Sequence, residues 1–197
     1  MNNQIQIPDF WKMLSESNNE VVLDTDPMFL VSDYEVFTIA NIEFIKFPSR
    51  EGRTPILSKN LLFDSVFGHS NNLSESDELL ARMNREVLTK VTEVVGEDNV
   101  LEFETDLISL DGLKDYGSFR SKISLPTVDF IRQNAEILDR YNPGSAYYTA
   151  SPFSTPRHGY SRFVCYVHSV GALFGCVCGC SLGVRPFLIL DSLLFGS

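Results

Sequence analysis

The chain has 197 residues, of which 44% are hydrophobic and 12% aromatic, as is typical of a globular rather than a disordered protein. Its net charge of −10 argues against direct nucleic-acid binding, which needs Lys and Arg to displace counterions from the phosphates. No run approaches the ~20 apolar residues that cross a bilayer, so we expect no membrane insertion.

The charge is distributed unevenly along the chain. Of the 26 acidic residues, 25 lie at or before Asp139, so the first 140 residues carry −12 and the remainder +2. One interpretation is that the acidic part keeps the protein soluble. The other is an acidic surface that mimics nucleic acid or docks on a basic partner.

Residues 1–32 are predicted to form an N-terminal appendage, with a short helix over Asp9–Leu14. This start of the chain lacks the apolar run of a signal peptide. Residues 33–197 are predicted to form one α+β domain.

The domain begins with strand-like sequence. β-branched and aromatic residues predict strands over Glu35–Ala40 and Ile42–Phe47, with a turn or bulge at Asn41. Ser49–Thr54 is expected to be a polar loop, and Ile56–Phe67 another strand and turn.

Two helices follow. Apolar residues at helical spacing predict the first from about Ser74 to Val95, ended by Gly96. We expect Leu80, Met83, Val87 and Val91 to face the core, and Glu78, Glu86 and Glu93 to be exposed. The second is expected to begin near Pro126 and to carry Phe130, Ile131, Ile137 and Leu138.

Strands and loops are expected from Asn142 to the end of the chain, closing with a buried strand over Val184–Leu190. Arg185 should then be held by hydrogen bonds, since a buried guanidinium without partners is costly. Pro186 has no N–H to donate, so it should lie at a strand end or face away from a ladder partner.

Cys165, Cys176, Cys178 and Cys180 raise the question of a metal site. Thiolates suit zinc, and His158 and His168 could add nitrogen ligands, but zinc sites pair their cysteines in hooks two to four residues apart. On a strand, alternation would instead place residues 176, 178 and 180 on one face. We therefore expect free thiols and no metal or cofactor, with zinc and a disulfide as alternatives.

An enzyme is the less favoured interpretation. His69, His158 and His168 could each act as an acid or base, but no nucleophile elbow, P-loop, dinucleotide fingerprint or zinc-protease motif is present. Glu102, Glu104 and Asp106 could bind a cation, but they lack the spacing of a calcium loop.

Aromatic residues are unusually dense between Tyr147 and Phe174. Some must pack in the core, but loops rich in Tyr, Ser, Gly and Arg are also typical of binding surfaces. Strand alternation would place Tyr166 and His168 on one face with Arg162. The candidate ligand-binding residues are Phe153, Arg157, His158, Tyr160, Arg162, Tyr166, His168, Phe174 and Cys178.

Several segments resemble a family of uncharacterised domains from phages, prophages and surface proteins of Gram-positive bacteria. The segments are Arg82-Met83-Asn84, Ile123-Ser124-Leu125-Pro126, Thr149-Ala150-Ser151-Pro152, Gly171 and Gly183-Val184-Arg185-Pro186. The last is the most specific. Where the family has Trp-Trp-Leu-Arg, this chain has Tyr147-Tyr148-Thr149-Ala150.

The family is similar in layout to C-type-lectin-like proteins, including the variable proteins of diversity-generating retroelements. The resemblance implies a C-type-lectin-like fold with mixed or antiparallel sheets, two helices and a loop-rich C-terminal face. It also implies that the strands near Val36–Ile45 and Val184–Leu190 lie close together. The triplets of calcium-dependent lectins are absent from the sequence, so calcium-dependent sugar binding is not expected.

Two functions follow as expectations. The first is a non-enzymatic recognition module of a phage or mobile element that binds a protein or glycan through its C-terminal face. The second is an inhibitor of a host defence system, similar to an anti-CRISPR. It would act on a host defence protein through its acidic body, the acid-rich first 140 residues. Either would be found in the host-cell cytoplasm or in a phage particle released by lysis. The oligomeric state is not indicated.

Overall fold

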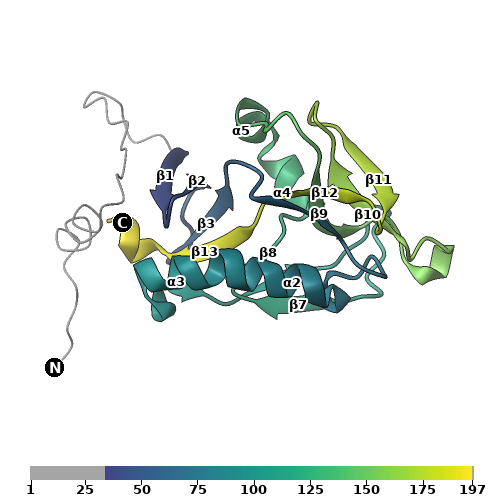
Figure 1. Ribbon diagram of the computed structural model, residues 1–197, viewed down its shortest axis with the longest axis horizontal. Coiled ribbons are helices and arrows are strands. Elements are labelled where there is room, and N and C mark those ends of the chain that lie inside the picture. Colours follow the sequence, from purple (N-terminus) through teal and green to yellow (C-terminus); the bar gives the residue numbers. More distant parts are fainter. Residues whose placement is uncertain (1–33, 197) are drawn as a thin grey trace.

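The computed structural model describes residues 34–196, so the appendage expected over residues 1–32 lies outside it. The described chain is α+β, as predicted, with two sheets, a two-stranded ribbon and a long helix beneath them (Figure 1). The first sheet has the order β1 (Glu35–Ile39), β2 (Ile42–Lys46), β3 (Arg53–Ser58), β13 (Phe187–Asp191) and β5 (Val100–Leu101), with β8 (Ile123–Ser124) also paired to β13. The second sheet has the order β11 (Leu173–Val177), β10 (Phe163–Val167), β9 (Tyr147–Pro152), β12 (Ser181–Val184) and β4 (Phe63–Val66). The ribbon pairs β6 (Phe103–Asp106) with β7 (Ser118–Ser121).

The first hairpin forms where the sequence predicts it. β1 pairs antiparallel with β2, and Ala40 and Asn41 adopt positive φ values of 52° and 61° in the turn between them. Asn tolerates this left-handed conformation, which two-residue hairpin turns require. The polar loop expected to extend to Thr54 ends earlier, because β3 already begins at Arg53, which pairs with Asp191 of β13.

A bent pair of antiparallel chain segments joins the two sheets. β3 pairs with β13 in the first sheet, and β4 pairs with β12 in the second, so residues 53–66 run antiparallel to residues 181–191 through both. At the bend Ser58 donates its N–H to the Pro186 carbonyl (3.0 Å), and Leu62 donates to the Val184 carbonyl (3.0 Å). Pro186 therefore lies between two strands, as predicted, where a missing N–H removes no ladder bond.

Arg185 fills the corner where the sheets diverge. Its side chain is fully buried, its Nε donates to the Ser58 carbonyl (2.9 Å), and its guanidinium lies over the Tyr147 ring at 4.8 Å from the centroid. Nη1 and Nη2 have no hydrogen-bond partner among the described residues, so the expected polar anchoring is only partial. Burial lowers the pKa of Arg185. The aromatic face compensates part of this desolvation.

The early and late strands share one sheet. β1 and β2 are separated from β13 by β3, so the segments Val36–Ile45 and Val184–Leu190 lie in the same sheet without pairing directly. The two segments are therefore near each other, as expected, in that they belong to one sheet with β3 between them.

The long helix spans Asp77–Val95 in three parts, α2 (Asp77–Met83), the π-helical turn η2 (Asn84–Leu88) and α3 (Thr89–Val95). Its buried residues recur at strict intervals of four, and they are Leu79, Met83, Val87, Val91 and Val95. Since each residue turns an α-helix by about 100°, a four-residue step overshoots one turn by about 40°. The wider turn, in which the Thr89 N–H bonds to the Asn84 carbonyl, corrects this drift and keeps the stripe on the core.

The predicted helix faces are largely confirmed. Met83, Val87 and Val91 are buried, and Glu78 and Glu93 are exposed. Leu80 is only half-buried, and its neighbour Leu79 takes the core position. Glu86 is also half-buried, because it pairs with Arg82 (2.9 Å).

The second helix is broken into α4 (Val128–Gln133) and α5 (Ala135–Arg140). Asn134 interrupts it, with its side-chain Nδ2 donating to the Phe130 carbonyl (2.9 Å). Asn competes in this way with the helical backbone. Ile131, Ile137 and Leu138 are buried as expected, against a satellite core that includes Phe47 and Tyr147. No helix within residues 34–196 is long and apolar enough to cross a membrane.

The corner leaves no room for a side chain at Gly183. A Cβ there would fall inside contact distance of Leu61 Cδ1 and 3.0 Å from the Ala146 carbonyl oxygen. We expect Gly183→Ala to lower the free energy of unfolding by about 1–3 kcal/mol, because backbone as well as side-chain atoms must shift. Chemical denaturation measures this loss.

Gly179→Ala is the matched control, since a Cβ at Gly179 meets nothing within 4 Å. Adding Leu61→Ala to Gly183→Ala should relieve the side-chain part of the clash. Equal stability of Gly183→Ala and Gly179→Ala would contradict the packing described at the corner.

Candidate binding face

The loop between β9 and β10, residues 153–162, is fixed from below by one buried side chain. Asn71 donates through Nδ2 to the carbonyls of Ser154 (2.7 Å), Tyr160 (3.1 Å) and Phe163 (2.7 Å). Its Oδ1 accepts from the hydroxyl of Tyr116 (2.7 Å). A fully buried amide with all these partners holds the loop in one shape.

Two acids of the body fix the outer part of the same loop. Asp111 accepts from Ser154 Oγ (2.6 Å) and lies 2.9 Å from His158 Nδ1. Asp115 accepts from Thr155 Oγ1 (2.6 Å) and pairs with Arg157. Arg157 is thus ion-paired within the molecule, and His158 is held against a carboxylate.

The geometry at Asp111 differs from a catalytic Ser-His-Asp relay. In that relay the imidazole uses one nitrogen for the carboxylate and the other for the hydroxyl. Here Ser154 Oγ lies 3.4 Å from the same Nδ1 that faces Asp111, and Ser154 donates directly to the carboxylate. The cluster is therefore built to hold a loop, and Ser154 itself is buried.

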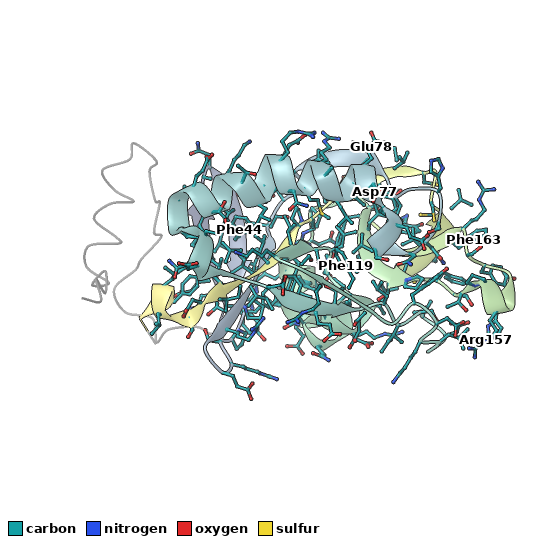
Figure 2. All side chains as sticks on the ribbon, turned by 90° about the horizontal axis from the view of Figure 1, so that it is seen from below. Phe44, Asp77, Glu78, Phe119, Arg157 and Phe163 are labelled. Carbon is teal, nitrogen blue, oxygen red and sulfur yellow. The ribbon has the colours of Figure 1, made fainter. Side chains whose placement is uncertain are left out.

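The nine candidate residues fall into three groups rather than one site. In the first group, Tyr160 packs edge-on between Phe153 (6.0 Å between ring centroids) and Phe163 (5.8 Å). Phe153, Tyr160 and His158 border a hollow of about 180 Å³. Tyr160 remains 49% exposed, and Arg157 at the tip of the loop is exposed but bound to Asp115 (Figure 2).

The second group lies on the β10–β11 hairpin. Tyr166, His168 and Phe174 form a cluster with ring centroids 5.7–6.4 Å apart. Tyr166 and His168 lie together as expected, but Arg162, predicted to share their face, precedes β10 and borders the cleft of the third group instead. Phe174, opposite Tyr166 on the neighbouring strand, is 50% exposed.

The third group borders a cleft of about 790 Å³ between this sheet and the start of α2. Arg162, Val66 and Val177 line the cleft together with Asp77 and Glu78 at the start of the helix. Figure 2 shows the two acids on the helix. Cys178 contributes to the cleft wall but is only 3% exposed, so its predicted exposure is wrong. Its carbonyl accepts from Phe67 N–H (2.9 Å), which ties the residue after β11 to the residue after β4.

Cys176, Cys178 and Cys180 do not lie on one strand face as expected. β11 ends at Val177, so Cys178 and Cys180 lie in the following turn rather than on the strand with Cys176. All four thiols are free, and burial raises the pKa of Cys165 and Cys176 to about 12 and that of Cys178 to about 11. Protonated thiols are poor nucleophiles and ligands. Within residues 34–196 no group of three or more His, Cys, Asp or Glu side chains is placed to hold a metal ion.

Several residues that shape the face were not identified from the sequence. Asp111 and Gly112 form a turn, with Gly112 N–H donating to the Ser109 carbonyl (2.8 Å), as an Asp-Gly pair indicates. Nothing local indicated that Asp111 also binds the loop 43 residues further on. Asn71 carried no signal either, because a lone Asn before a helix is usually assigned to capping.

Comparison with family models, with curated proteins and with solved structures found no match to this chain.

The Asp111 cluster predicts a pH dependence of stability. Hydrogen bonds from Ser109, Ser154 and His158 hold the pKa of Asp111 well below its usual range, against the opposing effect of burial. A carboxylate with a lowered pKa stabilises the fold above its unfolded pKa of about 4, and this stabilisation is lost as the pH falls. Asp111→Asn should therefore cost about 1 kcal/mol at pH 7, a modest value because the side chain is 36% exposed.

The difference between Asp111→Asn and the wild type should shrink as urea unfolding is repeated from pH 7 down to about pH 2. Asp98→Asn is the control, since Asp98 is exposed and forms no ion pair within the described residues. A pH-independent difference would refute the assignment to the ionised carboxylate.

Proposed function

We propose that this chain is a non-catalytic recognition module of a phage or mobile genetic element, which binds a protein or glycan through its C-terminal face. The observation that carries the proposal is the placement of exposed apolar side chains. Of the six large hydrophobic residues that are exposed among residues 34–196, five belong to the second sheet and its loops, and they are Val66, Tyr160, Val170, Phe174 and Val177. Exposed apolar area that gathers in one part of a molecule is typical of interaction sites.

The rigidity of the loop supports the same proposal. Asn71, Asp111 and Asp115 hold residues 154–163 in place before any ligand arrives. A pre-ordered loop loses little conformational entropy on binding, which favours affinity. Tyr160 and Arg162 belong to residue types that often dominate interface energies.

The C-type-lectin-like layout is part of this proposal. It is supported by the first and last strands of the described chain lying in one sheet, and by a second sheet whose loops form the candidate face. The phage origin rests on the resemblance of the Gly183-Val184-Arg185-Pro186 segment and its companions.

A second candidate function is an anti-CRISPR-like inhibitor that occupies a basic channel of a host defence protein with its acidic body. It is favoured by acids along the long helix and its exit that are exposed and form no ion pair within the described part of the chain. These acids are Asp77, Glu78, Glu93 and Asp98. Several others in the same region are already paired, including Glu97 with Lys122 (2.5 Å) and Glu102 with Arg120 (3.5 Å).

The test compares two sets of variants in the same binding assays. The immobilised protein is offered a lysate of its bacterial host, with bound proteins quantified by mass spectrometry, and a glycan array. Tyr160→Ala with Arg162→Ala should abolish capture, since hot-spot truncations cost roughly 2 kcal/mol or more each. Glu93→Lys with Asp98→Lys should leave capture unchanged.

The inhibitor function predicts the opposite pattern, with binding that survives the face variants, fails with the charge reversals and weakens steeply with salt. Thermal melting of the wild type and both double variants separates lost binding from lost folding. Specific capture that neither set of variants affects would refute both functions.

A further inference from the structure

β11 is an open edge of the second sheet. It pairs only with β10, and the β10–β11 hairpin lies at the end of the molecule opposite β1 (Figure 1). Cys178 N–H bonds to the Arg162 carbonyl (2.9 Å) at one end of the hairpin, and His168 N–H bonds to the Ala172 carbonyl (2.8 Å) at the other. Since hydrogen-bonded pairs alternate in an antiparallel ladder, the backbone groups of Leu173, Gly175 and Val177 point away from β10. Of these, the Val177 carbonyl already accepts from Cys180 N–H (3.0 Å) in the turn that follows the strand.

This edge lacks the features that normally protect one. Edge strands are usually guarded by charges, prolines, bulges or a covering element. β11 has the sequence Leu-Phe-Gly-Cys-Val, with no charge and no proline, and Phe174, Gly175 and Val177 are exposed.

Two other sheet edges, β4 and β1, are protected by charged side chains. At β4 the long helix contributes Arg82, whose Nη1 donates to the Asp64 carbonyl (2.8 Å) and whose guanidinium lies over the Phe63 ring. At β1 a charged pair, Glu35 with Lys46 (3.2 Å), lies at the strand end. Of these three edges, β11 is the one whose strand carries no charged side chain.

The outward groups suit pairing with an identical strand. Leu173, Gly175 and Val177 are evenly spaced about Gly175, so a two-fold axis at this residue would place Leu173 opposite Val177 of the second copy and Gly175 opposite itself. The Gly175 pair then forms two hydrogen bonds, and Val177 N–H of each copy donates to the Leu173 carbonyl of the other. Phe174 faces Cys176 of the second copy in a non-hydrogen-bonded pair. Closed two-fold pairing of this kind satisfies both edges at once.

Gly175 also brings an aromatic ring to the axis. The Phe153 ring lies over Gly175 so closely that a Cβ there would come within 2.5 Å of Phe153 Cδ2. Phe174 projects from the opposite face of the same strand, because neighbouring strand residues alternate. An added strand would therefore meet apolar rings on both faces of the sheet.

Charge favours this edge over the acidic parts of the surface as the place where two copies meet. The chain carries −10 overall, yet there is no acidic residue between Asp139 and Asp191. Two copies approaching through their acidic bodies would repel each other, whereas two β11 edges bring no acidic side chains of their own strands together.

We propose that two copies of this chain pair antiparallel through β11, joining their second sheets into one continuous sheet with Gly175 at the two-fold axis. The dimer goes beyond the proposed ligand binding and presents two loop faces at once, which raises avidity for a repetitive target. It assigns Phe174 to the contact between copies, and it leaves Tyr160 and Arg162 to the ligand. Because the strand has only five residues, the interface is small, and we expect micromolar rather than nanomolar association.

Sedimentation equilibrium of the full chain, from about 1 µM to about 300 µM, tests the association itself. The wild type should shift from monomer to dimer over this range. Phe174→Lys with Val177→Lys should remain monomeric, because charges on an edge oppose strand pairing. Val170→Lys is the matched control, since Val170 is 72% exposed in the same hairpin but lies outside the strand.

A crosslink tests the register. Across a non-hydrogen-bonded pair the Cα atoms are about 4.5 Å apart, which suits a disulfide. Phe174→Cys should therefore form a dimer with native Cys176 of the second copy when treated with diamide, which takes up the two electrons and two protons released by the thiols. The crosslink should disappear in Phe174→Cys with Cys176→Ser and be absent in Val170→Cys.

A wild type that stays monomeric throughout the range overturns the proposal. So does a dimer that survives the strand charges, is lost equally in the Val170→Lys control, or lacks the predicted crosslink. Melting curves for each variant confirm that it is folded. Ligand capture by the Tyr160 and Arg162 variants is measured separately, so failure of the dimer and failure of the proposed function give different results.

Discussion

The chain passes from the second sheet to the first at Arg185 and Pro186, and the guanidinium of Arg185 occupies the space between the diverging sheets. One hydrogen bond to the Ser58 carbonyl and the face of Tyr147 hold it there. Ser58 ends β3 and Tyr147 begins β9, so this one side chain contacts both sheets at the point where they separate. A leucine of similar volume would fill space but could not bond the carbonyl, and a lysine could not stack its flat face on the ring.

The residues on either side of Arg185 are constrained by the same corner. Gly183 lies against Leu61 and the Ala146 carbonyl, and Pro186 offers a carbonyl to Ser58 without needing a partner for an N–H. Val184 is buried in the main core. Each residue of Gly183-Val184-Arg185-Pro186 is thus explained by the bend between β12 and β13, and the role of this segment is structural.

The uneven charge of the sequence takes on a different meaning in three dimensions. Asp111 and Asp115 come from the acidic part of the chain, yet they bind His158 and Arg157 and order the loop of the candidate face. Part of the negative charge is therefore used in contacts within the molecule. Exposed acids without an ion pair within the described residues lie along the long helix and its exit, whereas β11 carries no charged side chain, so the two interaction surfaces differ in chemistry.

The sequence by itself determined the elements whose signal is local. The turn at Asn41, the long helix over Asp77–Val95 and its buried stripe were predictable, because a left-handed turn residue and helical spacing act within a few positions. The break at Asn134 was missed, since Asn in a helix is tolerated in some contexts and disruptive in others. Neither Asn71 nor Asp111 could be assigned to the candidate face, because their partners lie 83 and 43 residues away in the chain. Tertiary structure alone decided which aromatic residues are exposed, which cysteines are buried and which strand is left open, because each depends on what packs against it from distant segments.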